Sequence, residues 1–450
     1  MERTNFTATT NACKLCTPLG AALVFRGIYN CVPILHGSQG CSTYIRRYLI
    51  SHFKEPIDIA SSNFTEESAI FGGRNNLIAS IKNVSKQYEP DILGIATTCL
   101  SETIGEDLTL MLANIETEFT DEKMPVIVNV STPSYSGTHI DGFHSAVKAM
   151  IQKFAQFDSP GEHVNIFPGM VSPADIRYLK EIFEDFGIKG IILPDYSDTL
   201  DGGPWNEYQK IPEGGTTIEE MELSGSAKAT IEIGKTLLGT NSAGRYLEEF
   251  GSVPLIRFGL PIGINETDKL VECLEELSGC DLPEKHNKER LRLIDSYADG
   301  HKYVFGAKAV VYGEEDLVVS IAQFLAETGI DPVVCASGGN TGKLSKLLKE
   351  SLPAKVYERC TIKSGADFID IEELIKETYP DFIIGNSKGY TTSRKLNIPL
   401  IRIGFPVHDR FGGQRILHLG YRGTQQLFDL IVNTMIEIKQ NASPVGYTYM

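Results

Sequence analysis

Short apolar runs alternate with longer segments of helical period along the whole chain. Each run is followed by glycine, proline, serine or threonine, and this alternation is typical of βα units and parallel sheets. We therefore predict buried strands at these runs, which lie at 32–37, 91–99 and 125–132 in the first third, at 164–169, 190–195 and 253–259 in the middle, and at 308–313, 331–335, 381–385 and 398–404 in the last third.

Two polar or Gly/Pro-bearing stretches, Phe157–His163 and Tyr297–His301, separate the three groups of strands. Such stretches are typical of domain boundaries. The sequence thus predicts an α/β protein of three Rossmann-like domains, each a mostly parallel sheet flanked by helices. They cover residues 1–160, 161–300 and 301–450, the last with a C-terminal helix and tail.

Composition and charge exclude several classes of protein. With 450 residues, 42% hydrophobic and 22% charged, the chain is neither a disulfide-stapled mini-protein nor largely disordered. The formal charge of −16 would repel a phosphate backbone, so we expect no nucleic-acid partner. No apolar run approaches the ~18 residues needed to cross a bilayer, and the first residues are polar. We expect a cytoplasmic protein without a membrane partner.

Cysteines gather near the start of the chain and follow predicted strands. Five of the nine fall in the first 99 residues. Cys41 closes the segment after the first strand, Cys99 follows the second directly, and Cys16 precedes both, while the third strand leads into Ser131–Gly137. Because side chains that act in open α/β sheets gather at the carboxyl ends of strands, chemistry is expected there.

Two interpretations of these cysteines stay open at this point. Thiolates converging from separate segments, with small residues and backbone N–H groups nearby, could bind an iron–sulfur cluster. Free cysteines are also among the most buried residues, so the three could simply fill the core.

Cys13 and Cys16 form a CxxC, which suits a redox dithiol or half of a zinc site. No second CxxC follows, which disfavours zinc.

Other motifs are less informative. Gly338–Ser345 is similar to a phosphate loop, but Ser337 stands at the first required glycine and Leu344 at the Ser/Thr position, so we expect no ATP site here. A dinucleotide or nucleotide-sugar enzyme is disfavoured because no G-x-G-x-x-G with a following acidic residue occurs. His36 flanks the cysteine motifs and could donate to a sulfur or cap the strand end.

An ordered set of motifs resembles the β-type subunit of nitrogenase component 1. That group comprises NifK, its vanadium and iron-only counterparts, and the cofactor-assembly homologue NifN. The resemblance covers nearly the whole chain. It is carried by the segments 16–22, 36–41, 51–56, 69–73, 97–107, 132–134, 194–202, 214–217, 384–387, 401–406 and 419–423.

The resemblance implies an oxidoreductase subunit with a shared cluster. A P-cluster-type Fe–S cluster would be held by Cys16, Cys41 and Cys99 of this chain and by three cysteines of the α-type partner. Ser134 matches a serine that can add a ligand, and Phe71 matches an apolar residue of the docking surface for the iron protein. Without the resemblance, Phe71 is interpreted as a core residue.

The resemblance also implies an α2β2 heterotetramer and an ATP-driven iron protein that donates electrons. A metallocofactor of the FeMo-cofactor type would lie in the α-type partner, so no catalytic residue is expected in this chain.

Two departures keep a reductase and a NifN-type scaffold both open. Only 15 residues precede Cys16, whereas catalytic molybdenum β subunits are expected to carry a long N-terminal extension. The chain also has Gly420-Tyr-Arg-Gly423 where those subunits tend to have Gly-Tyr-Glu-Gly, and Leu200-Asp-Gly202 is similar to NifN. NifN proteins commonly retain fewer of the three cysteines, however, and this chain has all of them.

Overall fold

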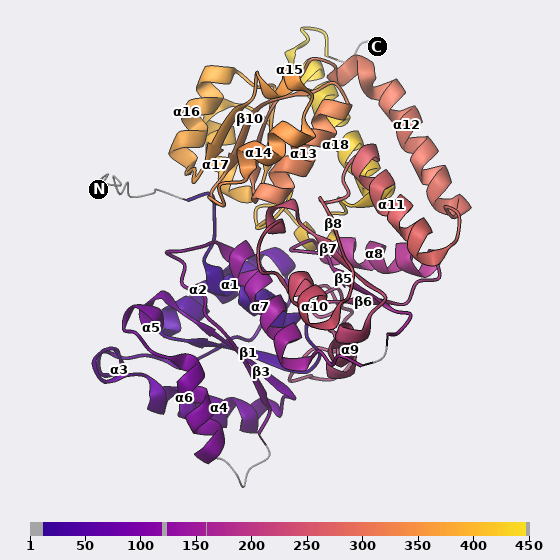
Figure 1. Ribbon diagram of the computed structural model, residues 1–450. Helices are drawn as coiled ribbons and strands as arrows, with labels where there is room; N and C mark the ends of the chain where they lie inside the picture. Colours follow the sequence, from indigo (N-terminus) through magenta and orange to yellow (C-terminus); the bar gives the residue numbers. More distant parts are fainter. Residues whose placement is uncertain (1–11, 119–123, 159, 447–450) are drawn as a thin grey trace.

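Three parallel sheets form the framework of the protein. A computed structural model describes residues 12–118, 124–158 and 160–446. In Figure 1, the indigo-to-purple first third, the magenta-to-red middle and the orange-to-yellow last third form three α/β regions packed around a common centre. The predicted α/β architecture of three Rossmann-like units is confirmed.

The first sheet has the strand order β2-β1-β3-β4, with every pair parallel. Its central strands are fully buried, which fits their apolar sequences. The elements are α1 (Thr17–Arg26), β1 (Cys31–His36), α2 (Gln39–Phe53), β2 (Ala60–Ser61), α3 (Glu66–Phe71), α4 (Arg74–Tyr88), β3 (Ile92–Thr97), α5 (Cys99–Thr103), α6 (Leu108–Glu118), β4 (Val126–Val130) and α7 (His139–Phe154).

The second sheet repeats this plan with the order β6-β5-β7-β8. Strand β7 was not predicted, because Glu232 interrupts its apolar run. That carboxylate is buried and accepts from Arg257 Nε at 2.7 Å. The elements are β5 (Val164–Phe167), α8 (Pro173–Asp185), β6 (Gly190–Ile192), α9 (Ile218–Leu223), β7 (Ala229–Ile233), α10 (Ala243–Gly251), β8 (Leu255–Phe258), α11 (Ile264–Ser278) and α12 (Glu284–Val304).

The third sheet has the order β11-β10-β9-β12-β13. Edge strand β11 was not predicted, since its residues are only partly buried. The elements are β9 (Lys308–Gly313), α13 (Glu315–Glu327), β10 (Asp331–Ser337), α14 (Leu344–Ser351), α15 (Ala354–Tyr357), β11 (Thr361–Ser364), α16 (Phe368–Thr378), β12 (Phe382–Gly385), α17 (Tyr390–Leu396), β13 (Leu400–Arg402) and α18 (Gly420–Ala442).

One predicted linker is a helix. Tyr297–His301 lies inside α12, a helix of 21 residues that packs against α18 (Figure 1). Leu293, Gly300 and Val304 of this helix are buried, so the polar residues between them are its outer face. The described residues of the other predicted boundary, 157–158 and 160–163, lie between α7 and β5 outside any helix or strand. Among the described residues, no helix is both long and apolar enough for a bilayer.

Candidate functional site

The turns that carry Cys41 and Cys99 meet at the switch point of the first sheet. Strands β1 and β3 are neighbours, and the chain passes from β1 to β2 on one side and from β3 to β4 on the other. In open α/β sheets, ligands bind in the crevice that this reversal leaves at the carboxyl ends of the strands. The two turns are in close contact: a Cβ at Gly37 would lie 1.9 Å from Thr98 Oγ1, so only glycine fits there.

All three candidate cysteines stand at helix starts. Cys16 is the N-cap of α1, Cys41 lies in the first turn of α2, and Cys99 is the first residue of α5. Cys16 is exposed and the other two are partly buried. The free N–H groups at a helix N-terminus favour negative charge, which suits a thiolate. None of the three is fully buried, although Cys41 packs against the edge of the hydrophobic core.

Ser134 lies between two of the cysteine segments. Its backbone N–H donates to Cys99 Sγ at 3.3 Å, and its hydroxyl accepts from the N–H of Thr17 at 3.1 Å. Thr17 directly follows Cys16, so the serine connects the loop after β4 with the starts of α1 and α5. The loop after β4 therefore lies at the same edge of the sheet as the turns after β1 and β3.

The three thiols interact electrostatically. Burial raises the pKa of the Cys41 thiol, and the neighbouring thiols of Cys16 and Cys99 raise it further. Three thiolates at this spacing repel one another unless a positive charge lies among them. Among the described residues, no set of three His, Cys, Asp or Glu side chains is arranged to hold a single metal ion.

The remaining cysteines have other surroundings. Cys13, Cys31, Cys273 and Cys335 are buried in the hydrophobic core, and burial raises the pKa of Cys13 and of Cys31 to about 12. Cys13 therefore does not form a dithiol site with the exposed Cys16. Its backbone N–H donates to the carbonyl of Ala366 at 3.3 Å, which makes it part of the packing between the first and third regions.

The segment before Cys16 is held by the third region. Lys388 Nζ donates to the carbonyls of Ala12 and of Lys14, the latter at 3.4 Å. The glycine-rich segment 338–343 belongs to the same contact zone, where Lys343 Nζ donates to the carbonyl of Leu238 at 2.8 Å. The lysine of the phosphate-loop-like motif is thus bound to backbone oxygens of the second region.

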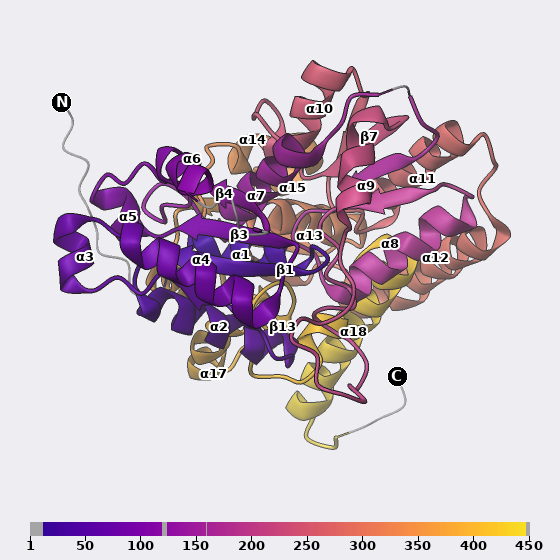
Figure 2. The same ribbon diagram turned by 90° about the horizontal axis from the view of Figure 1, so that it is seen from below.

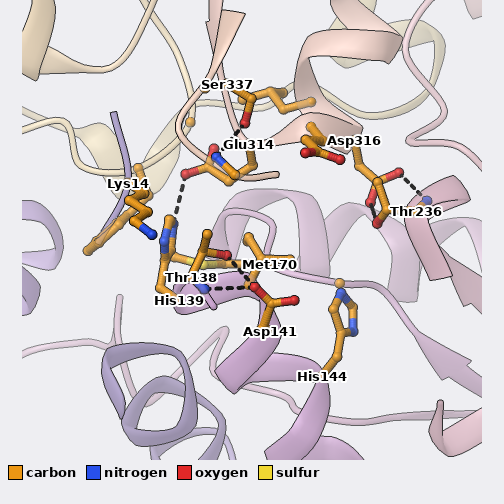
Figure 3. Close-up of a pocket in the computed structure, with 18 of the residues that line it drawn as sticks. Lys14, Thr138, His139, Asp141, His144, Met170, Thr236, Glu314, Asp316 and Ser337 are labelled. Atoms are coloured by element: carbon orange, nitrogen blue, oxygen red, sulfur yellow. Dashed lines mark hydrogen bonds and ion pairs between the residues drawn. The ribbon is translucent and has the colours of Figure 1, made fainter. Parts of the chain in front are cut away.

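A cavity of about 1050 Å³ lies where the three regions meet, and Figure 3 shows part of its lining. There His139 Nε2 lies 2.8 Å from Glu314 Oε1, and its Nδ1 accepts from the N–H of Leu15 at 3.3 Å. Asp141 accepts from the N–H of Thr138 at 2.7 Å (Figure 3). These carboxylates are already engaged inside the protein, and the His139–Glu314 pair joins the first region to the third beside the Cys16 segment.

Phe71 lies at the surface and not in the core. It is the last residue of α3, and its side chain is 83% exposed; Ile70 beside it is 76% exposed. Gly72 ends the helix with φ = 92°, a conformation that a residue with a side chain rarely adopts. The core interpretation of Phe71 is therefore wrong.

Sequence reasoning singled out His36 but missed Glu106, its partner; both ring nitrogens of His36 contact oxygen atoms, and neither contacts a sulfur in the described part of the chain. His36 Nε2 lies 2.8 Å from Glu106 Oε2, and both side chains are buried. The ring of His36 therefore contacts a carboxylate, and its Nδ1 contacts Ser62 Oγ at 3.1 Å. Nothing in the sequence pairs His36 with Glu106, which follows it by 70 residues. The only available signal was that both lie in segments adjoining candidate ligands.

Comparisons with known proteins agree with this geometry. The family model for nitrogenase component 1 type oxidoreductases matches residues 16–436. The chain is a β-type member of this family. The molybdenum-iron protein β chain of Clostridium pasteurianum is 35% identical over 95% of this chain and 93% of its own length. The β chain of Methanothermobacter thermautotrophicus is 37% identical over 97% of this chain and 96% of its own.

Solved nitrogenase structures share the fold. A chain of nitrogenase Cp1 at pH 6.5 matches with a TM-score of 0.95 and 34% identity over 100% of this chain and 98% of that one. A chain of nitrogenase Cp1 at pH 5 matches with a TM-score of 0.73 at 17% identity, which shows the fold alone. Because relatives named as molybdenum-iron protein β chains are covered over 93% and 96% of their lengths, the expected long extension does not distinguish this chain from them.

Arg422, where this nitrogenase-family chain departs from the expected Gly-Tyr-Glu-Gly, is paired locally. From α18 it donates to Glu181 of α8 at 2.7 Å and to Glu289 of α12 at 2.6 Å. Its guanidinium also stacks 4.5 Å above the ring of Tyr178. Hydrogen bonds from Arg422 lower the pKa of Glu181 to about 2. The arginine therefore joins three helices, and its presence has a structural explanation.

Replacing Arg422 with glutamine is expected to destabilise the protein by about 1 kcal/mol. Glu181 and Glu289 each lose one charged partner, but they keep Lys285 and Tyr178, and the site is about one-third exposed. The loss should be present at neutral pH and shrink as the pH falls from 4.5 towards 2, where Glu181 becomes protonated. Thermal unfolding of the variant and the parent over this pH range measures the effect. An unchanged Tm at pH 7 would show that the three-helix contact does not depend on Arg422.

Proposed function

We propose that this chain is the subunit of a nitrogenase-type reductase that holds half of a P-cluster-type Fe–S cluster. In this role it relays electrons from an ATP-driven iron protein to a metallocofactor in the α-type partner. The convergence of Cys16, Cys41 and Cys99 at the switch point of one sheet carries the proposal. The match to the family of nitrogenase component 1 type oxidoreductases, and to relatives named as nitrogenase molybdenum-iron protein β chains, supports it.

The donor set at this edge fits such a cluster. Thiolate sulfurs are the usual ligands of iron in these groups, and cluster sulfurs are stabilised by nearby N–H donors. In the proposal, Cys16, Cys41 and Cys99 bind iron, and Ser134 stands ready as a further oxygen ligand. A bound cluster would supply reversible electron storage. The chain itself would set the cluster's surroundings through thiolate ligation, helix N-termini and partial burial.

Exposure of Cys16 has a simple reason in this proposal. A cluster shared between two chains must lie at their interface, so its ligands must be accessible on the isolated subunit. The ligands missing from this chain would come from the α-type partner, as would the cofactor on which substrate is reduced. This chain then contributes no catalytic residue of its own.

Docking of the iron protein is proposed at α3. Phe71 and Ile70 together expose an apolar surface at the end of this helix. In Figures 1 and 2, α3 and α5 lie at the same outer edge of the first region, and α5 begins with Cys99. A donor bound at α3 would thus be close to the proposed cluster, which electron transfer requires.

The assembly implied by this proposal is testable. We expect the chain to be incomplete alone, to form an obligate αβ pair, and to pair again into an α2β2 heterotetramer. The αβ interface should exceed the ~2,000 Å² typical of permanent complexes. Co-expression with the cognate α-type subunit, followed by native mass spectrometry, measures this. A stable monomer that binds a complete cluster without a partner would contradict it.

A NifN-type assembly scaffold is the second candidate, favoured by Leu200-Asp-Gly202 and by Arg422. Both functions use the same fold and the same shared cluster position, but only a reductase forms product. The purified heterotetramer, supplied with its cognate iron protein, a reductant and ATP, should reduce substrate if the chain is a reductase. Full cluster occupancy with no product under these conditions would favour the scaffold.

A further inference from the structure

A buried hydrogen-bond chain runs beneath α3, from the turn after Phe71 to the turns that carry the candidate cysteines. Its central residue is Glu106. One oxygen of this carboxylate accepts from the backbone N–H of Gly73, and the other lies 2.8 Å from His36 Nε2. The side chain of Glu106 is only 7% exposed and that of His36 is fully buried. A carboxylate buried to this extent is costly unless both oxygens are bound, and here both are.

The turn held by Glu106 is also supported by a hydrogen bond from Ser68 Oγ of α3 to Asn76 Oδ1 of α4 at 2.9 Å, but little apolar packing fixes α3. In α3 only Ser68 is buried, so apolar packing does not fix this helix. At Gly73 the backbone is packed so closely that a Cβ would lie 2.1 Å from the ring of Phe64. Gly73 is also the N-cap of α4 and has no side chain with which to cap it. The carboxylate of Glu106, which is not part of α4, takes the place of the missing N-cap side chain. Negative charge is favoured at a helix N-terminus.

The other end of the chain reaches both cysteine turns. The carbonyl of His36 accepts from the N–H of Thr98 at 3.1 Å and from Ser101 Oγ at 2.9 Å, at the start of the helix that Cys99 opens. The ring of His36 contacts Ser62 Oγ, which also accepts from the N–H of Gly37 at 2.9 Å. Gly37 begins the turn that leads to Cys41.

We propose that Glu106 is a positioning residue for electron-donor docking. Its carboxylate fixes the turn between α3 and α4 so that Phe71 is presented to the donor. Through His36 it also connects that turn with the segments that carry Cys41 and Cys99. This inference rests on the proposed function, because it concerns the same docking surface. It adds a residue that does not touch the donor and acts through Phe71.

A double-mutant cycle tests this directly. The variants are Glu106→Ala, Phe71→Ala and the double variant, each purified as the heterotetramer with its cognate α-type subunit and titrated with the cognate iron protein. We expect Glu106→Ala alone to weaken docking at least fivefold. In the Phe71→Ala background it should weaken docking less than twofold, because the side chain through which it acts is gone. Iron content should stay unchanged.

Two further variants separate positioning from charge and from folding. Glu106→Gln keeps an oxygen that accepts from the N–H of Gly73, and its amide N–H can donate to His36 Nε2 when the ring proton is on Nδ1. Docking should therefore remain within about threefold of the parent. Asp107→Asn removes the charge of the neighbouring exposed carboxylate but keeps an acceptor for the N–H of Leu110, and it should leave docking nearly unchanged. Equal losses in Asp107→Asn and Glu106→Ala would overturn the inference in favour of a surface-charge effect.

The failure of this inference is distinguishable from that of the proposed function. If Phe71→Ala leaves donor affinity unchanged, the docking surface itself is wrong. If Phe71→Ala weakens docking and Glu106→Ala does not, only the positioning role is overturned. The same holds if Glu106→Ala weakens docking by the same factor in the parent and in the Phe71→Ala variant. Melting curves of all variants show whether a loss of docking follows a loss of fold.

Discussion

Cys41→Ala is expected to strip most of the iron from the purified complex and to weaken its assembly. The thiol of Cys41 has its pKa raised by burial and by Cys16 and Cys99, which both lie near it. Removing it deletes one of the three sulfurs that this chain is proposed to supply. Because binding of a metal group contributes directly to the stability of the site that holds it, the αβ interface should weaken as well.

The measurement is iron content per heterotetramer beside the Fe–S electronic spectrum, both taken under anaerobic conditions. Cys335→Ser is the matched control, since this cysteine is fully buried in β10 of the third sheet. It should keep its iron and change only packing. Iron content and spectrum that stay at parental values in Cys41→Ala would refute the ligand assignment.

Phe71→Ala is expected to weaken docking of the iron protein by an order of magnitude or more. An aromatic side chain at the centre of an interface can contribute ~2 kcal/mol or more, which corresponds to a change in Kd of this size. Because 83% of the side chain is exposed, its removal leaves no cavity in the core. The Tm and the iron content should therefore stay nearly unchanged.

A donor titration of electron transfer, run beside a melting curve, separates the two effects. Tyr379→Ala is a suitable control, because Tyr379 is a similarly exposed aromatic residue in the third region, far along the chain from α3. Its donor affinity should match that of the parent. Unchanged donor affinity in Phe71→Ala would mean that the donor binds elsewhere.

Most of the fold follows from local sequence patterns. The ten predicted strands are present because each is a mainly apolar run in a sheet flanked by helices. Three strands were missed: β7 contains the buried, paired Glu232, β11 is a half-exposed edge, and β2 has only the two residues Ala60 and Ser61. Tyr297–His301 resembled a linker because a helix with one buried stripe is mostly polar in sequence.

The candidate site was only partly predictable. That Cys41 and Cys99 would lie near one another follows from strand order, since residues at the carboxyl ends of adjacent parallel strands meet. Contacts made by single side chains do not follow in this way. The bond from Ser134 to Cys99 and the pairing of His36 with Glu106 join residues 35 and 70 positions apart, and each depends on how whole turns pack. Such contacts leave no periodic signal in the sequence.

The most direct test of the central claim is an anaerobic structure of the heterotetramer, purified with its cognate α-type subunit, with iron located by anomalous scattering. The account predicts an iron cluster at the αβ interface, bonded on this side to the sulfurs of Cys16, Cys41 and Cys99. A cluster bonded to other residues of this chain, or these three sulfurs free of iron in a fully loaded complex, would contradict it.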